Sequence, residues 1–341
     1  MYRCEKLKNK CRRSSSALVF CTFYVFFSYD CRVTIFFYGD MHDMKIKLSI
    51  LGGDRRQSAL AVKMSEYGAT VSTFGTDTSG LSGVQGLTVC RKLDTCLDGA
   101  DAIILPLPAS GDGELVSCPV SGERIALDDV FSLAGQRPVL GGRFSPGVKR
   151  LAEKNGVRII DYFESEELKI RNSVLTSEGA VSVAMNELDV ALFGSRCLVT
   201  GYGRLAKTLA PMLRALGAEV TVAARKNIDL AWAAAYGFGT MKLGIKNNGE
   251  SSLTDLQSDI DVIFNTVPSW IFDRAVLEVV PPRTLIVDLA SAPGGIDPTA
   301  ARELGRRIVV ALSLPGKYAP VSAGRLIGEH IVEIFRQEGL I

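Results

Sequence analysis

The residues with the clearest chemical signature form a glycine-rich hexapeptide, Gly201-Tyr202-Gly203-Arg204-Leu205-Ala206. In this pattern the first glycine permits a tight turn, the second lets backbone approach a pyrophosphate, and the small third residue lets helix and strand pack closely. A helix that begins here also offers unpaired N–H groups and its positive dipole end to the same phosphates. We therefore interpret the hexapeptide as a dinucleotide-binding loop.

The flanking segments make this interpretation more specific. A short apolar run, 197–200, precedes the loop, and residues 205–216 carry leucines and a methionine at helical spacing before Gly217. Residues 219–223 then read as a second strand. In a chain with 33 glycines the hexapeptide alone would be weak evidence. Between two strands, and at the start of an apolar-faced helix, it predicts a dinucleotide-binding unit.

The second strand ends in Ala223-Ala224-Arg225-Lys226, with no acidic residue for the ribose hydroxyl of NAD. A carboxylate at this position would repel a 2′-phosphate, whereas a guanidinium can donate two hydrogen bonds to one. The residues thus favour NADP(H), with Arg225 as the main contact and Lys226 as a secondary contact. The alternative is that Arg225 is a solvated surface side chain.

Strands and helices are predicted to alternate along the rest of the chain. We expect an α/β fold of two doubly wound parallel sheets, both Rossmann-like, with an interdomain cleft. A substrate-side domain is expected over 44–170, an NADP-binding domain over 171–320, and a C-terminal helix over 321–341 that packs back on the first domain. The helix joining the domains is predicted over about 178–193, with Thr176 and Ser177 as caps and Glu178 in its first turn.

Ligands of doubly wound sheets bind at the carboxyl ends of the strands, and polar residues follow several predicted strands here. The candidates of the first sheet are Arg55, Arg56, Gln57, Ser110 and Arg143. Those of the second sheet, beside the expected nicotinamide, are Asn265, Thr266, Val267, Pro268, Asp288 and Ala290.

Composition excludes several other classes of protein. The net charge is +2 and no basic stripe with interleaved aromatics occurs, so nucleic-acid binding is not expected. The chain has only two histidines, His42 and His330, and neither follows a predicted strand. Imidazole-assisted removal of a hydroxyl proton, common in 2-hydroxyacid dehydrogenases, is therefore disfavoured. No metal-ligand spacing and no G-x-S-x-G nucleophile elbow occurs.

Residues 1–43 differ from the rest. Lysines and arginines precede the apolar stretch 17–27, as in a signal peptide, but no small-x-small cleavage site follows. Eleven residues are also too few to span a bilayer as a helix. We expect an N-terminal extension outside the functional fold, with a membrane or export signal as the alternative. The cysteines after residue 43 are scattered singly, which suits the cytoplasm.

From Met44 onward the chain is similar to the A subunits of dipicolinate synthase from spore-forming bacteria. The matching segments are LGGDRRQ (51–57), ILPLPASGDGE (104–114), NSVLTSEGAV (172–181), GYGRLAKTLA (201–210), NTVPSWIF (265–272), LIVDLASAPGGID (285–297) and LPGKYAPVSAG (314–324). They fall across residues 44–330, and the architecture is related to that of D-2-hydroxyacid dehydrogenases.

The resemblance implies NADP-dependent oxidation of dihydrodipicolinate to dipicolinate (pyridine-2,6-dicarboxylate) during sporulation, in the cytoplasm of the mother cell. It also implies a partner, the flavoprotein-like B subunit; no membrane or nucleic-acid partner is expected, and self-association is left open. Aromatisation drives such a step, so little acid–base machinery is needed. Arg55 and Arg56 suit one substrate carboxylate, and Thr176 and Ser177 the other.

The residues leave several alternatives open. Glu178 is a candidate base, and its other reading is a residue that only stabilises its helix. Another NADP-dependent dehydrogenase of a small hydroxy or amino acid would share the same architecture, and so would a non-catalytic NADP-binding subunit. The need for the B subunit, the stoichiometry, and the choice between a dihydro and a hydroxylated tetrahydro substrate stay open.

Overall fold

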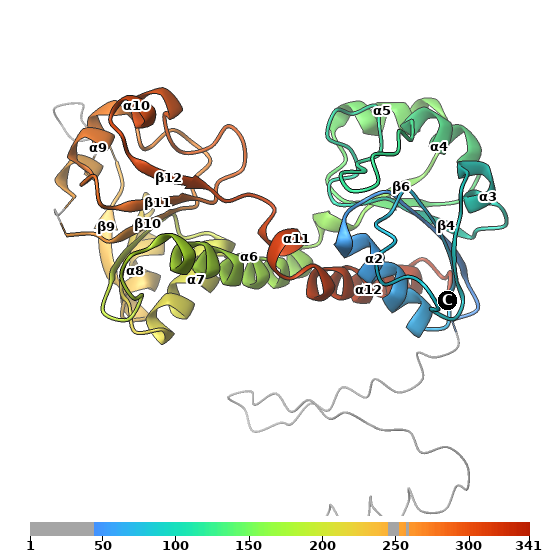
Figure 1. The fold of residues 1–341 in the computed structure, drawn as a ribbon, viewed down its shortest axis with the longest axis horizontal. Helices are drawn as coiled ribbons and strands as arrows, with labels where there is room; N and C mark the ends of the chain where they lie inside the picture. The colour runs from blue at the N-terminus through green and yellow to red at the C-terminus, as the bar shows by residue number, and fades with distance from the viewer. Residues whose placement is uncertain (1–43, 245–251, 257–258) are drawn as a thin grey trace, which may run out of the picture. The chain divides into compact units, whose positions relative to one another are not determined.

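Two six-stranded parallel sheets form the fold, as a computed structural model of the chain shows (Figure 1). The structure describes residues 44–244, 252–256 and 259–341, so the expected extension over 1–43 lies outside the described residues. The strand orders are β3-β2-β1-β4-β5-β6 and β12-β11-β10-β7-β8-β9. Because both sheets are parallel and reverse their order beside their first strand, the prediction of two doubly wound sheets is confirmed.

The first sheet forms because short apolar runs are buried on both faces, as parallel strands between helices require. All three residues of β4 are buried, as are four of the five in β1. Its strands are β1 (Lys47–Leu51), β2 (Thr70–Phe74), β3 (Leu87–Val89), β4 (Ala102–Ile104), β5 (Val139–Gly141) and β6 (Ile159–Asp161). Its helices are α2 (Arg55–Glu66), α3 (Leu93–Leu97), α4 (Leu127–Ala134) and α5 (Pro146–Lys154).

The second sheet aligns the carboxyl ends of its central strands. Thr200 pairs with Ala223 on one side and with Asn265 on the other, and Asn265 pairs with Asp288. Its strands are β7 (Arg196–Thr200), β8 (Glu219–Ala224), β9 (Gly239–Lys242), β10 (Val262–Asn265), β11 (Leu285–Asp288) and β12 (Arg307–Val310). Its helices are α7 (Arg204–Ala215), α8 (Asn227–Ala235), α9 (Arg274–Val279) and α10 (Pro298–Glu303).

The helix between the sheets begins 12 residues earlier than the sequence indicated. Helix α6 spans Glu166–Glu187, and Ser165 caps it by accepting a hydrogen bond from the Leu168 amide. Thr176 and Ser177 therefore lie inside the helix and are not its caps, so that prediction was wrong. Their hydroxyls donate to the carbonyls four residues earlier, at 172 and 173, which is the usual bond of these residues within a helix.

Two helices follow the second sheet and contact both halves of the chain. Helix α11 (Leu314–Tyr318) packs on α6, and α12 (Pro320–Gln337) packs on α2 of the first half. Gly324 makes the second contact close, since a Cβ there would clash with the Arg56 carbonyl oxygen. The predicted domain boundary at 170/171 falls inside α6, and the proposed domain limits stay a prediction.

Among the described residues no helix combines the length and the apolar content needed to cross a bilayer.

Candidate cofactor and substrate site

The turn between β7 and α7 has the backbone geometry that a phosphate-binding loop needs. Gly201 has φ +89°, and a Cβ at this residue would lie 2.5 Å from the Thr266 hydroxyl oxygen, so only glycine fits. Gly203 is the N-cap of α7 and forms no side-chain cap. A Cβ at Gly203 would meet nothing within 4 Å, so space lies open before this helix N-terminus. These residues fit a dinucleotide pyrophosphate.

The other four residues of the hexapeptide mainly support the loop. Tyr202 and Ala206 are buried in the hydrophobic core of the second sheet, and Leu205 packs against that core. The guanidinium of Arg204 forms an ion pair with Glu166 at 2.6 Å, which ties the start of α7 to the start of α6. Because these side chains have structural partners, the glycine backbone is the part of this loop that is left to contact a ligand.

The end of β8 carries exposed positive charge. The strand ends at Ala224, and the exposed Arg225 and Lys226 separate it from α8. In the described part of the chain neither of them forms an ion pair. A third cation, Lys242, pairs with Ala224 across the β8–β9 register and bonds the Asn227 side chain. Lys242 was missed at the sequence level because β9 itself was not predicted.

Three buried polar side chains form a chain across the ends of β7, β10 and β11. The Thr200 hydroxyl donates to Asn265 Oδ1 at 2.6 Å, and Asn265 Nδ2 donates to Asp288 Oδ1 at 2.8 Å. Asp288 also accepts from the backbone amides of Ala290 and Gly295, at 3.1 and 3.2 Å. The carboxylate therefore holds the loop that follows β11.

This network changes the expected role of Asn265. The sequence placed Asn265 beside the expected nicotinamide, but the side chain is fully buried and its two polar atoms already have partners. Besides the bonds above, Asn265 accepts from the Val267 amide and donates to the Val267 carbonyl, so it also fixes the loop after β10. The Thr266 hydroxyl likewise donates to the Thr200 carbonyl at 2.7 Å. Both side chains shape the strand-end loops.

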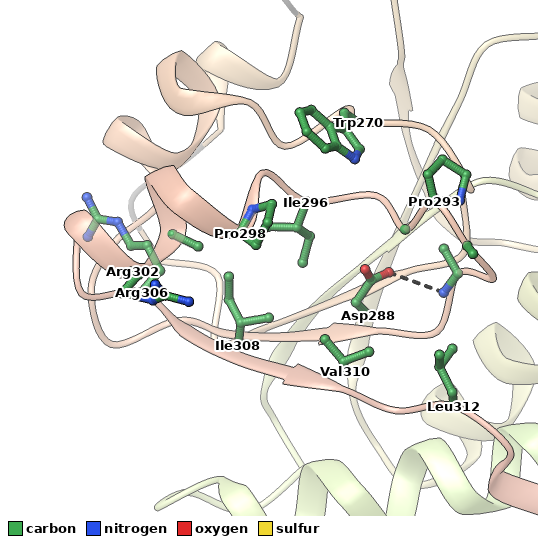
Figure 2. A pocket seen from close by; sticks show the side chains of 14 residues that line it. Trp270, Asp288, Pro293, Ile296, Pro298, Arg302, Arg306, Ile308, Val310 and Leu312 are labelled. Atoms are coloured by element: carbon green, nitrogen blue, oxygen red, sulfur yellow. Dashed lines mark hydrogen bonds between the residues drawn. The ribbon is translucent and has the colours of Figure 1, made fainter.

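A pocket of about 490 Å³ lies along β11 and β12, next to this network (Figure 2). Asp288 and Ala290 line it together with apolar side chains that were not predicted from the sequence: Trp270, Ile296, Ile308, Val310 and Leu312. Arg302 and Arg306 lie away from Asp288, near α10 (Figure 2). The sequence held one signal for Trp270, a tryptophan two residues after the candidate loop that ends at Pro268; in the structure its side chain is exposed.

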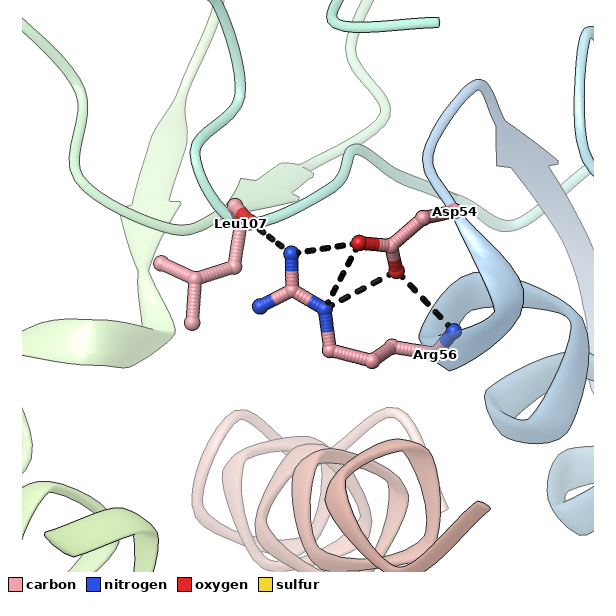
Figure 3. Close-up of polar contacts among 3 residues, drawn as sticks. All are labelled: Asp54, Arg56 and Leu107. Carbon is pink, nitrogen blue, oxygen red and sulfur yellow. Dashed lines mark hydrogen bonds and ion pairs between the residues drawn. The ribbon is translucent and has the colours of Figure 1, made fainter. Parts of the chain in front are cut away.

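In the first sheet the candidates divide into exposed and occupied side chains. Arg55 is exposed and near Asp77, whose pKa is lowered chiefly by the hydrogen bond from Ser79 and to a smaller extent by Arg55. Gln57 is buried, and its amide lies 3.5 and 3.4 Å from the carbonyls of Leu51 and Ile104. Arg56 is held by an ion pair with Asp54 and a bond to the Leu107 carbonyl (Figure 3).

Two further candidates lie on loops of this sheet. The Ser110 hydroxyl accepts from the Gly113 amide at 2.8 Å and bonds Asp112, so it stabilises its own turn. Arg143 has φ +59°, an unusual conformation for a residue with a Cβ, and Asp161 holds its backbone amide at 3.0 Å. Strained backbone of this kind concentrates at functional sites, and the Arg143 side chain is exposed.

The structure does not place Thr176, Ser177 and Glu178 at a helix N-terminus. Ser177 is buried and shares a 2.8 Å hydrogen bond with Thr208, which joins α6 to α7. Glu178 is exposed on α6. The anion-binding helix start that motivated the choice of Thr176 and Ser177 is therefore absent at this place, and their role toward a substrate stays a prediction. Among described residues no group of three potential metal ligands occurs.

Comparisons with known proteins agree with this architecture. The family model for the N-terminal domain of the dipicolinate synthase A subunit matches residues 47–163. The A subunit of dipicolinate synthase from Bacillus subtilis (strain 168) is 31% identical over 300 residues, which cover 86% of this chain and 98% of the relative. The crystal structure of the A subunit from Bacillus halodurans superimposes with a TM-score of 0.75 and 29% identity, covering 85% of this chain and 97% of that one.

A more distant structure shares the fold. D-lactate dehydrogenase from Escherichia coli aligns with a TM-score of 0.57 and 12% identity, over 86% of this chain and 97% of that one. The resemblance drawn from the sequence motifs is thus confirmed, and so is its architectural relation to dehydrogenases of hydroxy acids.

Proposed function

The chain belongs to the family of dipicolinate synthase A subunits, and we propose that it oxidises dihydrodipicolinate to dipicolinate with NADP⁺ as acceptor. The match over 98% of the relative's length is the observation that carries the proposal. The ring loses a hydride to NADP⁺ and one proton to solvent or a base, so that NADPH and an aromatic ring result.

The second sheet would hold the cofactor. The open backbone of Gly201 and Gly203 suits the pyrophosphate, and Arg225 with Lys226 suits the 2′-phosphate. The buried chain from Thr200 to Asp288 would keep the loops at the strand ends fixed. Backbone at Val267, Pro268 and Ala290 lies on these loops, which supports their assignment to the same site.

The substrate carries two carboxylates, and exposed arginines of the first sheet suit them. Arg55 and Arg143 are exposed, and Arg56 is oriented by Asp54. Aromatisation supplies much of the driving force, which fits strand-end loops without histidine. Glu178, which is exposed on α6, remains the proposed base.

The cellular setting is proposed from the family alone. It comprises sporulation, the cytoplasm of the mother cell and a partner, the flavoprotein-like B subunit.

The function is tested by following absorbance at 340 nm with the purified full chain and freshly generated dihydrodipicolinate. Four reactions are compared: NADP⁺ or NAD⁺, each with and without the B subunit. We expect NADPH formation that exceeds NADH formation. Faster turnover of a hydroxy or amino acid would instead identify another dehydrogenase. Binding of NADP⁺ without turnover, even when the B subunit is present, would identify a non-catalytic nucleotide-binding subunit.

A further inference from the structure

Asp54 and Arg56 form the most extensively bonded ion pair at the strand ends of the first sheet (Figure 3). Arg56 Nε lies 2.9 and 3.1 Å from the two Asp54 carboxylate oxygens, and Nη2 lies 2.8 Å from Oδ2. Nη2 also donates to the Leu107 carbonyl at 2.8 Å. These bonds fix the plane of the guanidinium, because a bidentate pair allows little rotation.

The third nitrogen of the guanidinium, Nη1, has no hydrogen-bond partner in the described part of the chain. It points away from Asp54 (Figure 3). Nη1 is also not fully buried, and the Arg56 side chain is 14% exposed. An arginine is thus held on two of its nitrogens, while the remaining donors reach a surface. Donors placed in this way are suited to a carboxylate.

Helix α11 covers the other side of the pair. A Cβ at Gly316 would lie 2.8 Å from Asp54 Oδ2 and 2.9 Å from Arg56 Nε, so only a glycine lets α11 approach this closely. The backbone of α11 therefore lies against the Nε edge and restricts a ligand's access to it. Of the three guanidinium nitrogens, Nη1 is the one left for recognition.

We infer that Asp54 is a positioning residue that aims Nη1 of Arg56 at one carboxylate of a pyridine dicarboxylate. The inference deepens the proposed function and rests on it. Because Arg56 is paired with Asp54, the contact selects by direction, while the neighbouring exposed Arg55 supplies net positive charge. The expected consequence is discrimination between ligands with two carboxylates and ligands with one.

The test compares the binding of pyridine-2,6-dicarboxylate and pyridine-2-carboxylate to the full chain by calorimetry. The variant is Asp54→Asn, because asparagine caps a helix about as well as aspartate but has one acceptor atom in place of two, so it cannot form a bidentate pair with a guanidinium. Asp273→Asn is the matched control, since Asp273 caps α9 at 3.0 Å from the Val276 amide and pairs with no arginine in the described chain.

Wild-type protein and the Asp273→Asn variant should both prefer the dicarboxylate. Asp54→Asn should lose about tenfold to a hundredfold in affinity for the dicarboxylate and little for the monocarboxylate, as expected for one charge-assisted hydrogen bond. The KM for dihydrodipicolinate should rise while the KM for NADP⁺ stays unchanged. Arg56→Lys keeps the charge and Asp54 but loses the planar donors, and should show the same selective loss if Asp54→Asn folds poorly.

The inference would be overturned if Asp54→Asn and Arg56→Lys kept the preference for the dicarboxylate, or if they lost equal affinity for both ligands. The proposed function would stand in either case if the protein still oxidised dihydrodipicolinate. If wild-type protein neither binds dipicolinate nor oxidises its dihydro form, the proposed function itself is wrong, and the role of Asp54 is refuted with it.

Discussion

Each sheet begins with a strand, a glycine turn and a 12-residue helix, at β1–α2 and again at β7–α7. In the first turn Asp54 caps the helix and pairs with Arg56, so side chains occupy the helix N-terminus. In the second turn Gly203 caps α7 without a side chain, and the space before the helix is open. The same topological position therefore holds an ion pair in one half and an open helix N-terminus in the other.

The side chains at the carboxyl ends of the strands also differ between the two sheets. The first sheet ends β1 and β4 with Leu51 and Ile104, whereas the second ends β7, β10 and β11 with Thr200, Asn265 and Asp288. The second set is a continuous buried hydrogen-bonded chain. Buried polar chains fix loop positions when every member is satisfied. The comparison indicates that the second sheet has a rigid polar edge at these strand ends, which the ends of β1 and β4 in the first sheet lack.

The largest effect is expected when the second turn is made to resemble the first. Gly203→Asp places a carboxylate where the phosphate should sit, and the residue's φ of −80° accepts any side chain. NADP⁺ binding should weaken by roughly a thousandfold, about 4 kcal/mol, because the new carboxylate and the pyrophosphate would repel each other. Fluorescence titration of the nucleotide measures the loss, and thermal melting should show a helix that is capped at least as well as before.

Gly203→Asn separates charge from size in this experiment. It offers a cap of the same shape without the charge, so it should retain most of the affinity for the nucleotide. Equal losses in the two variants would show that steric exclusion, and not phosphate binding, explains the open turn.

A second prediction concerns the polar edge. Asn265→Leu removes four hydrogen bonds at once and leaves the Thr200 hydroxyl and the Asp288 carboxylate buried without that partner. The free energy of unfolding should fall by about 3 kcal/mol, which urea denaturation measures. Ser49→Ala, which removes one buried bond to the Cys96 carbonyl in the first sheet, should cost about 1 kcal/mol. Similar losses of unfolding free energy in the two variants would contradict a special role for the hydrogen-bonded chain at the ends of β7, β10 and β11.

The smallest expected effect tests cofactor preference at β8. Arg225→Asp should weaken NADP⁺ binding by about 2 kcal/mol and spare NAD⁺, because only the 2′-phosphate meets the new charge. Calorimetry with both nucleotides measures the difference. Arg150→Asp changes an exposed arginine of α5 in the first half and should alter neither affinity. Equal losses for NADP⁺ and NAD⁺ in Arg225→Asp would remove the 2′-phosphate assignment.

Much of the architecture could be predicted because parallel strands buried on both faces appear as short apolar runs. The runs at 197–200 and 219–223 correspond to β7 and β8 within a residue at either end. The start of α6 could not be found from apolar runs. The helix also contains Gly179, a residue that is unfavourable inside helices. The structure shows why glycine is needed there: a Cβ would come within 2.8 Å of Leu314, a constraint that arises only in the folded chain.

The candidate site could be predicted only where it is formed by backbone and not by side chains. Gly201 and Gly203 were identified from spacing, since the geometry of a phosphate-binding turn restricts sequence directly. The internal use of Asn265 was not predictable, because its partner Thr200 lies 65 residues away in the sequence. Asp54 is only two residues from Arg56, but the Leu107 carbonyl that also binds this guanidinium lies 51 residues away. Spacing reveals local geometry, whereas a buried side chain's partners depend on which strands become neighbours.

The close packing of α12 on α2 has a consequence for synthesis. Residues 320–337 are translated after both sheets, yet Leu326, Ile327 and Ile331 in this helix are buried in the fold. The first half therefore leaves an apolar helix surface uncovered for most of translation and gains its last layer only when the late segment arrives. The first half is synthesised early, but a nascent chain of this kind should need protection from aggregation until elongation is nearly finished.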